Sequence, residues 1–164
     1  MKEILKYSCL IFLYALSHSY LATCFAIDLK IKGYEERYIG LSLSFWGIGV
    51  ILGALLHNLI RKKLNLFSTI LYGSIIQLSF SLIFLIDQNT FLVALMQFVM
   101  GITSAINSLT LESHISSKFK KTSGFYISLF WSSAGLGAIT GSLFIAINGI
   151  CLLYTSPSPR DRSS

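Results

Sequence analysis

The sequence has few charged residues, and proline is almost missing from it. Charged residues make up 12% of the 164 residues and hydrophobic residues 54%, whereas soluble domains carry about 25% charged residues. Both prolines, Pro157 and Pro159, lie close to the C-terminus, so none interrupts residues 1–150. Long helices are therefore possible throughout that region, and the low charge argues against a soluble domain.

The short motifs that mark common enzymes are also missing. The sequence has no G-x-S-x-G, H-E-x-x-H or C-x-x-C motif and no glycine-rich phosphate loop. Its histidines, His18, His57 and His114, are far apart and share no metal-ligand spacing. Glu112 and His114 are close, but an i, i+2 pair points to different faces of a helix. We therefore expect no enzyme, no cofactor and no bound metal, and no nucleic-acid motif accompanies the net charge of +6.

What the chain does have is five long apolar stretches. Each is about as long as the ~20 residues that a helix needs to cross ~30 Å of hydrocarbon. Short connections leave no polar face toward water, and helices satisfy their own backbone hydrogen bonds in lipid. We predict an all-α, polytopic transmembrane helix bundle in residues 1–150. The predicted spans are residues 5–27, 39–60, 66–86, 91–111 and 124–150.

Basic residues gather in alternate connections. The first connection, residues 28–38, is neutral overall, and the third holds only Asp87. Basic excess falls at the N-terminus and in the second and fourth connections, at Lys2, Lys6, Arg61, Lys62, Lys63, Lys118, Lys120 and Lys121. The positive-inside rule places this side in the cytoplasm. We predict an integral protein of the bacterial inner (cytoplasmic) membrane with a cytoplasmic N-terminus.

Residues 151–164 differ from everything before them. The run CLLYTSPSPRD, from Cys151 to Asp161, resembles one reading frame of a transposase-end sequencing adapter, a known contaminant at the ends of assembled gene fragments. Arg160 and Arg162 would also lie outside the cell, against the positive-inside rule. We interpret residues 151–164 as a non-native tail and residues 1–150 as the N-terminal piece of a longer protein.

The end of the second stretch resembles a transporter signature. Residues 53–62 read GALLHNLIRK, which resembles G-x-L-a-D-r-x-G-r-R/K, the motif between the second and third helices of the major facilitator superfamily. The matching positions are Gly53, Leu55, Arg61 and Lys62. His57 replaces the family's aspartate and Ile60 its glycine, so the usual gating salt bridge lacks its carboxylate here.

The fourth stretch carries a second resemblance to the same family. Residues 97–105 read QFVMGITSA, similar to R-F-x-x-G-x-x-x-A with Gln97 in place of arginine. The fifth stretch lacks the Gly-Pro pair of the antiporter signature. The resemblance covers residues 5–150 and implies the first five of twelve helices, a partial major-facilitator-like half with 3+2 helices of a 3+3 inverted repeat. The missing C-terminal helices of the same protein would then be its partners.

Polar side chains inside the stretches are the candidate site. Such groups usually face protein or a wet cavity at membrane depth. They either form interhelical hydrogen bonds or line a transport pathway, and His18 is either a neutral core imidazole or a solute contact and proton relay. In the resembled family the first and fourth helices line the central cavity. The substrate-pathway candidates are Tyr14, His18, Gln97, Asn107 and Ser108.

A second group of candidates lies near the predicted cytoplasmic side. Glu112 is expected to act as a gate or as a partner for Lys118 or Arg61. It joins the motif residues Gly53, His57, Arg61 and Lys62 in this group. Trp46 and Trp131 lie inside their spans rather than at the ends, so we interpret them as residues that fill the bundle.

Small residues recur at helical spacing on the second and fifth stretches. They are Gly49, Gly53, Ser133, Gly137 and Gly141, each four residues from the next on its own stretch. This spacing allows close helix packing. The alternative is a sliding surface, because in the resembled fold the second and fifth helices face the other half of the protein.

The favoured function is secondary active transport of a small solute by alternating access, with a proton or another ion as a possible coupling partner and membrane lipid around the helices. The fragment is expected to be inactive alone. One alternative is a small membrane scaffold or assembly protein that uses the glycine faces for docking. A weaker alternative is an integral-membrane enzyme.

Overall fold

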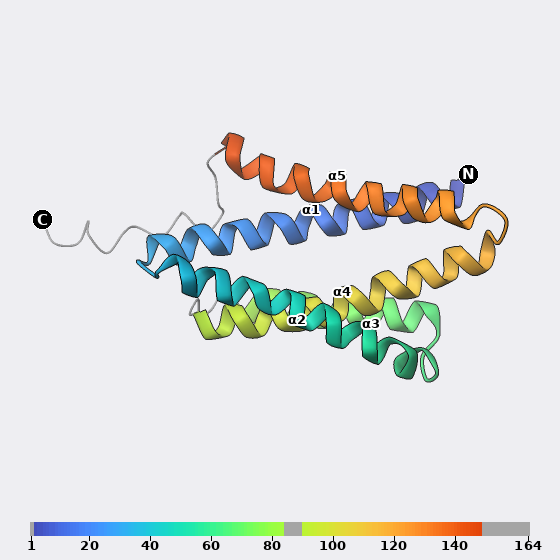
Figure 1. Cartoon of the computed structure of the whole chain (residues 1–164), viewed down its shortest axis with the longest axis horizontal. Helices are drawn as coiled ribbons and strands as arrows, with labels where there is room; N and C mark the ends of the chain where they lie inside the picture. The colour runs from blue at the N-terminus through green and yellow to red at the C-terminus, as the bar shows by residue number, and fades with distance from the viewer. Residues whose placement is uncertain (1, 84–89, 149–164) are drawn as a thin grey trace, which may run out of the picture.

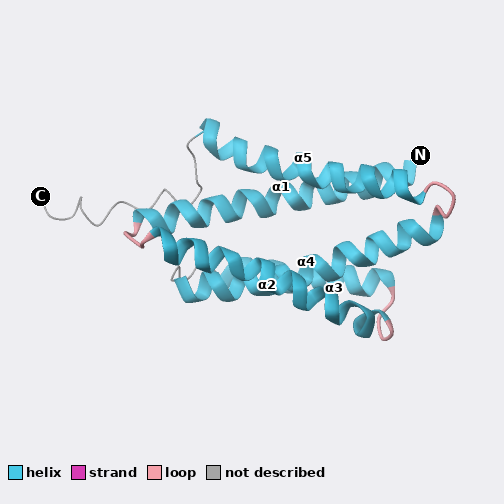
Figure 2. Ribbon diagram, in the orientation of Figure 1, coloured by secondary structure: helices cyan, strands magenta, loops and turns pink. Residues whose placement is uncertain are grey.

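A computed structural model describes residues 2–83 and 90–148 of the chain. In this part the chain forms helices without strands, which confirms the all-α prediction (Figure 2). The helices are α1 (Lys2–Ile31), α2 (Glu36–Arg61), α3 (Leu66–Ile83), α4 (Thr90–Lys118) and α5 (Ser123–Asn148). The predicted span ends at residues 84–86 and 149–150, and the tail at residues 151–164, lie outside the described residues.

Four of these helices are long and apolar enough to cross a membrane. They are Glu3–Ile31, Glu36–Arg61, Thr90–Lys118 and Ser123–Ile147. The described part of α3, Leu66–Leu82, is apolar but shorter. The prediction of membrane helices is therefore confirmed for four of the five spans.

The helices extend beyond several of the predicted span limits. The largest difference is in α4, which continues from the predicted end at Leu111 to Lys118. Apolar composition marks the part of a helix that suits hydrocarbon. The backbone hydrogen bonds of the helix continue through polar residues until the chain turns, so the limits of the helix and the apolar span differ.

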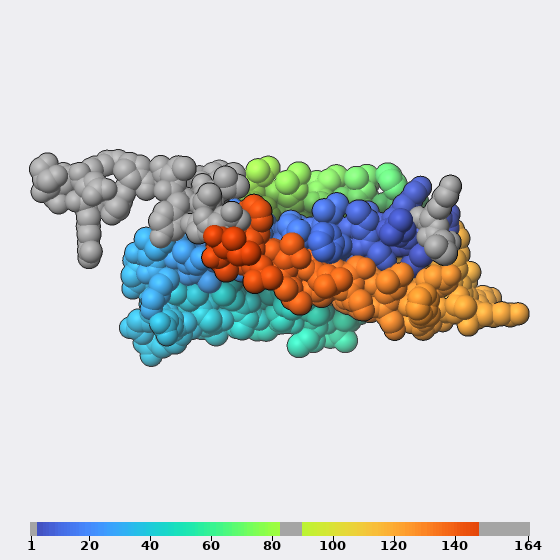
Figure 3. All heavy atoms as spheres, turned by 90° about the horizontal axis from the view of Figure 1, so that it is seen from above, coloured from blue at the N-terminus to red at the C-terminus, as the bar shows by residue number. Residues whose placement is uncertain are grey.

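The helices associate mainly as two pairs, α1 with α5 and α2 with α4, while α3 packs on α4 (Figure 1). The view from above shows the orange and red α5 lying along the blue α1 (Figure 3). Within each pair the helices run in the same direction, because their contacts advance along both chains. Gly137 meets Phe12, and one turn later Gly141 meets Leu16.

Glycines bring the backbones of each pair into contact. A Cβ added at Gly101 of α4 would meet the carbonyl oxygen of Trp46 and would lie 2.9 Å from the nitrogen of Val50, both on α2. A Cβ at Gly141 of α5 would likewise meet the carbonyl oxygen of Leu16 on α1. A helix pair this close requires glycine at the crossing, because any side chain would hold the backbones apart.

The two pairs use their glycines in the same way. Gly49 and Gly53 of α2 face the backbone of α4 at Phe98 and Ile102. Gly137 and Gly141 of α5 face the backbone of α1 in the same spacing. In each pair, one helix supplies two glycines four residues apart and the other supplies the backbone that they meet. In this respect α2 is equivalent to α5, and α4 is equivalent to α1.

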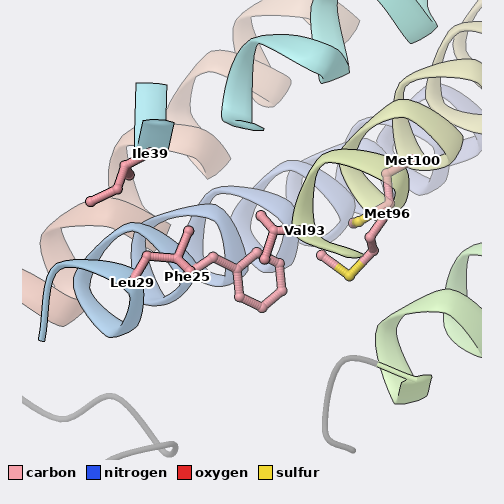
Figure 4. Close-up of a cluster of buried hydrophobic side chains, with 6 residues drawn as sticks. All are labelled: Phe25, Leu29, Ile39, Val93, Met96 and Met100. Atoms are coloured by element: carbon pink, nitrogen blue, oxygen red, sulfur yellow. The ribbon is translucent and has the colours of Figure 1, made fainter. Parts of the chain in front are cut away.

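Buried apolar side chains form two main clusters, one toward each end of the bundle. One cluster joins α1, α2 and α4 through Phe25, Leu29, Ile39, Val93, Met96 and Met100 (Figure 4). The other joins the first half of α1 to the end of α4 and to α5 through Ile4, Ile11, Leu111, Ile115 and Phe130. We call them the first and second apolar clusters. The part of α1 between Ile11 and Phe25 contains Tyr14 and His18.

The charged turns lie at the two ends of the bundle. The N-terminus, the α2–α3 turn and the α4–α5 turn lie at one end, on the right in Figure 1, and the α1–α2 turn lies at the other. The α1–α2 turn is closed by Gly33 in the left-handed region, with φ of 84°, as is common where a helix ends. The basic connections are therefore on one side of the bundle, which we call the basic end.

We expect Gly141→Ala to destabilise the bundle. The added methyl group would meet the backbone of Leu16, and overpacking of this kind costs about 1–3 kcal/mol. Thermal unfolding of the full chain in detergent, followed by circular dichroism, measures the effect. Gly135→Ala is the matched control on the same helix, because nothing lies within 4 Å of its Cβ position. An equal loss of stability in both variants would contradict the proposed role of close approach.

Candidate functional site

A layer of polar and aromatic side chains lies inside the bundle, beside and between the two apolar clusters. We call it the polar layer. Its members come from α1, α2, α3 and α4. They are Tyr14, His18, Trp46, Gln77, Gln97, Ser104 and Asn107.

Tyr14 connects α1 to α3 and α4. The side-chain nitrogen of Gln77 donates a hydrogen bond of 2.9 Å to the Tyr14 hydroxyl group. Ser104 of α4 also lies next to this hydroxyl group. Tyr14 thus brings three helices together through one polar atom, which suits its amphipathic ring.

His18 lies one turn further along α1, between two aromatic rings. Its ring stacks on Tyr14 at a centroid distance of 6.5 Å and approaches Trp46 of α2 at 5.4 Å. Gln97 of α4 lies beside the imidazole. The histidine is therefore held by side chains of three helices, and its orientation depends on all of them.

Two carboxamides of α4 are almost completely buried. Gln97 is 2% exposed and Asn107 is 8% exposed. The Asn107 amide packs against Gly73 of α3, where a Cβ would lie 2.5 Å from its oxygen. Gly73 is one helical turn from Gln77, so Asn107 extends the polar layer along the α3–α4 contact.

Three atoms of the polar layer form no hydrogen bond of regular geometry, although the Gln97 and His18 side chains lie close enough to interact with each other. They are Nε2 of His18, Oε1 of Gln97 and Oδ1 of Asn107, and all three are buried. Leaving a buried polar atom unpaired costs about 1–3 kcal/mol, and lipid offers no replacement partner. The layer therefore has unused capacity to bind water or a polar ligand.

Within residues 2–83 and 90–148, no fixed charge lies at the level of this layer. The sequence has no Asp, Glu, Lys or Arg at residues 7–27, 38–60, 64–83 or 90–111. The groups available are hydroxyls, amides, an imidazole and an indole, which exchange hydrogen bonds with neutral polar molecules. Within the described residues, no group of His, Cys, Asp and Glu could hold a metal ion.

The structure brings most of the predicted pathway residues together. Tyr14, His18, Gln97 and Asn107 all belong to the polar layer. Ser108 is buried on α4, 7% exposed. Gln77 was not among the predicted residues, although a glutamine inside a long apolar stretch was the signal that could have indicated it.

Glu112 has a different neighbour from the one expected. The indole nitrogen of Trp131 donates to a Glu112 carboxylate oxygen across 3.4 Å, and Lys118 forms its ion pair with Glu3. The expected pairing of Glu112 with Lys118 or Arg61 is therefore wrong for this structure. The pairing of Lys118 with Glu3 could not be predicted from the sequence, because the two residues are far apart along the chain.

The tryptophans do not simply fill the bundle. Trp46 is 36% exposed and Trp131 is 47% exposed. Trp46 presents its ring to His18, and Trp131 contacts Glu112. The expectation that both fill the bundle is wrong, because each ring lies partly outside it.

The other motif residues lie along the same two helix pairs. Gly53 is buried against Ile102 and Ala105 of α4. His57 is half-buried and its Nε2 has no hydrogen-bond partner. Arg61 ends α2, and Lys62 follows as its C-cap. Ser133 donates to the carbonyl oxygen of Leu129 in its own helix.

Two hollows on the bundle lie away from the polar layer. One, of about 410 Å³, is lined by Ala26, Ile27, Lys30, Ile31, Glu36 and Ile39 at the α1–α2 turn. The other, of about 210 Å³, lies between the starts of α2 and α4. Neither is lined by a residue of the polar layer, and both have mainly apolar walls, so we assign the candidate site to the layer.

No protein-family model, curated protein or solved structure matches this chain.

We expect a double-mutant cycle of Tyr14→Phe and Gln77→Leu to show coupling. The hydrogen bond between these residues joins α1 to α3, and such bonds in membrane proteins contribute about 0.6 kcal/mol on average. Unfolding free energies of the full chain in bicelles give the coupling. Tyr14→Phe with Ser79→Ala is the control pair, because Ser79 bonds only to the carbonyl of Ile75 in its own helix. Equal coupling in the two cycles would refute a direct Tyr14–Gln77 interaction.

Proposed function

We propose that the chain is part of a secondary transporter and that its polar layer lines the path of a small solute. One observation carries this proposal. Three buried polar atoms without a regular hydrogen bond lie beside or between the two apolar clusters, in helices that are suited to cross a membrane. A structural core gains nothing from such atoms, because each one lowers stability. A pathway needs them, since a solute that leaves water must exchange its hydrogen bonds for new ones.

The apolar clusters have a role in this mechanism. The first apolar cluster, with Phe25 and Met100, packs around Gln97 at one end of the polar layer, and Ile11 and Leu111 close the other end. A polar solute crosses such a barrier only when the helices separate there. Opening one cluster while the other stays packed gives alternating access.

The matched helix pairs support the same proposal. The packing relates α1 to α4 and α2 to α5, and the chain reverses direction three times between the members of each couple. An odd number of reversals leaves the two members antiparallel, so the two units have inverted orientations. Inverted repeats with a binding site at their interface are common in secondary transporters, and α1 and α4 both contribute to the polar layer.

Uncovered faces of α2 and α5 are suited to further helices of the same protein. Nothing lies within 4 Å of the Cβ positions of Gly40 and Gly47 on α2, or of Gly135 on α5. Ser44 of α2 and Ser132 of α5 are also exposed. Gly47 and Gly135 each come two residues before a packed glycine, so the two open faces are equivalent. Small residues of this kind permit close docking of another membrane helix.

We expect Gln97→Leu and Asn107→Leu to slow solute uptake by about fivefold each. Each substitution removes one hydrogen bond between the amide and the passing solute, which contributes about 1 kcal/mol. The assay is counterflow of labelled neutral and charged solutes in proteoliposomes that contain the protein encoded by the uninterrupted gene. Ser79→Ala is the control, since its hydroxyl lies outside the polar layer. Unchanged uptake in both amide variants, with normal folding, would contradict the assignment of the pathway. Association with a partner without any uptake would favour the scaffold role.

The basic end is expected to face the cytosol. A cysteine at Lys62 should therefore resist an impermeant maleimide in intact cells and react after permeabilisation. A cysteine at Glu35, in the turn at the opposite end, should react in intact cells. The reverse pattern would overturn the orientation and would leave the polar layer unaffected.

A further inference from the structure

The two ends of the bundle differ in how many of their cations form ion pairs. At the α1–α2 turn each cation has an acidic partner. Lys30 pairs with Glu36 at 2.7 Å, Lys32 with Asp28 at 2.9 Å and Arg37 with Glu35 at 2.8 Å. This end is therefore neutralised within the protein.

The basic end is not neutralised in this way. Lys118 pairs with Glu3. Within the described residues, the cations of the two turns form no ion pair: Arg61, Lys62 and Lys63 in the α2–α3 turn, and Lys120 and Lys121 in the α4–α5 turn. Like charges at this density repel one another, so an anion held against them lowers the electrostatic energy.

Each basic turn also continues into an exposed aromatic residue. Phe67 comes four residues after Lys63 and is 73% exposed, and Phe125 comes four residues after Lys121 and is 70% exposed. Each phenylalanine lies in the first turn of its helix, α3 or α5. A cationic turn next to an exposed apolar side chain matches a phosphate that is attached to an acyl chain better than it matches a free phosphate ion.

We propose that the α2–α3 and α4–α5 turns bind the headgroups of anionic phospholipids at the basic end, with Phe67 and Phe125 against the upper acyl chains. In a membrane these turns lie at the level of the lipid headgroups, because they cap the apolar helices. Basic residues near an anionic lipid surface each contribute about 1 kcal/mol of attraction. The interaction needs no solute transport, so it is independent of the function proposed above.

The test uses the full chain in bilayers of phosphatidylcholine with a trace of spin-labelled lipid. Electron spin resonance gives the fraction of labelled lipid that the protein immobilises. We expect labelled phosphatidylglycerol to associate at least about twofold more strongly than labelled phosphatidylcholine. The triple variant R61Q/K62Q/K63Q should lose most of this preference, and F67A/F125A should reduce it in part.

The matched control is K30Q/K32Q/R37Q, which removes three positive charges from the opposite end. It should keep the preference for phosphatidylglycerol. Equal loss of the preference in the two triple variants would overturn the proposal, because net charge alone would then explain the effect. Equal association of the two labelled lipids with the unmodified chain would also overturn it. Circular dichroism of each variant separates a loss of binding from misfolding.

Sodium phosphate, compared with sodium chloride at equal ionic strength, tests the alternative source of the anion. The proposal requires both salts to weaken the preference to the same extent through screening. Selective displacement by phosphate, together with no effect of F67A/F125A, would assign the turns to free phosphate and would also overturn it.

Discussion

The structure depends on close backbone contact at glycines. Lipid is as apolar as the helix surfaces, so burial of apolar area does little to drive membrane helices together. Packing has to supply the attraction, and it weakens quickly with distance. Gly101 against Trp46 and Gly141 against Leu16 hold the two helix pairs at backbone distance. The same contact places the Trp46 ring beside His18, so the geometry of the polar layer follows from the helix crossings.

The bundle separates its chemistry along its length. Charged turns lie at the two ends, the apolar clusters lie inside them, and most members of the polar layer lie between the clusters. This order follows from the cost of each group in hydrocarbon, which is highest for charges and lower for hydroxyls and amides that share hydrogen bonds. The buried atoms of His18, Gln97 and Asn107 that form no regular hydrogen bond are exceptions, because their desolvation is not offset within the protein. Such exceptions are expected where a site must bind something that is not always present.

Some sequence expectations were wrong, and the reasons are physical. Glu112 was expected to pair with Lys118 or Arg61, but pairing depends on which helix ends meet in space, and Lys118 meets Glu3. Trp46 and Trp131 were expected to fill the bundle. Large side chains do fill the bundle at Phe25 and Phe130, but the two tryptophans lie at its surface, 36% and 47% exposed. Gly49, Gly53, Gly137 and Gly141 are buried against neighbouring helices, which favours close packing over a sliding surface for these residues. The small residues that remain uncovered on α2 and α5 include Gly40, Gly47 and Gly135.

The sequence by itself determined the helical class, four of the membrane-suited spans and the clustering of basic residues in alternate connections. These properties depend on local composition, which hydrocarbon and water select directly. Tertiary structure decided which helices pair, which polar residues meet and which charges remain without partners. Gln77, for example, joins Tyr14 only because α1 and α3 meet there, and a contact between residues 63 positions apart cannot be read from the pattern of either helix alone. The periodicity of a helix shows which residues share a face, but the partner of that face is set by the fit between whole helices.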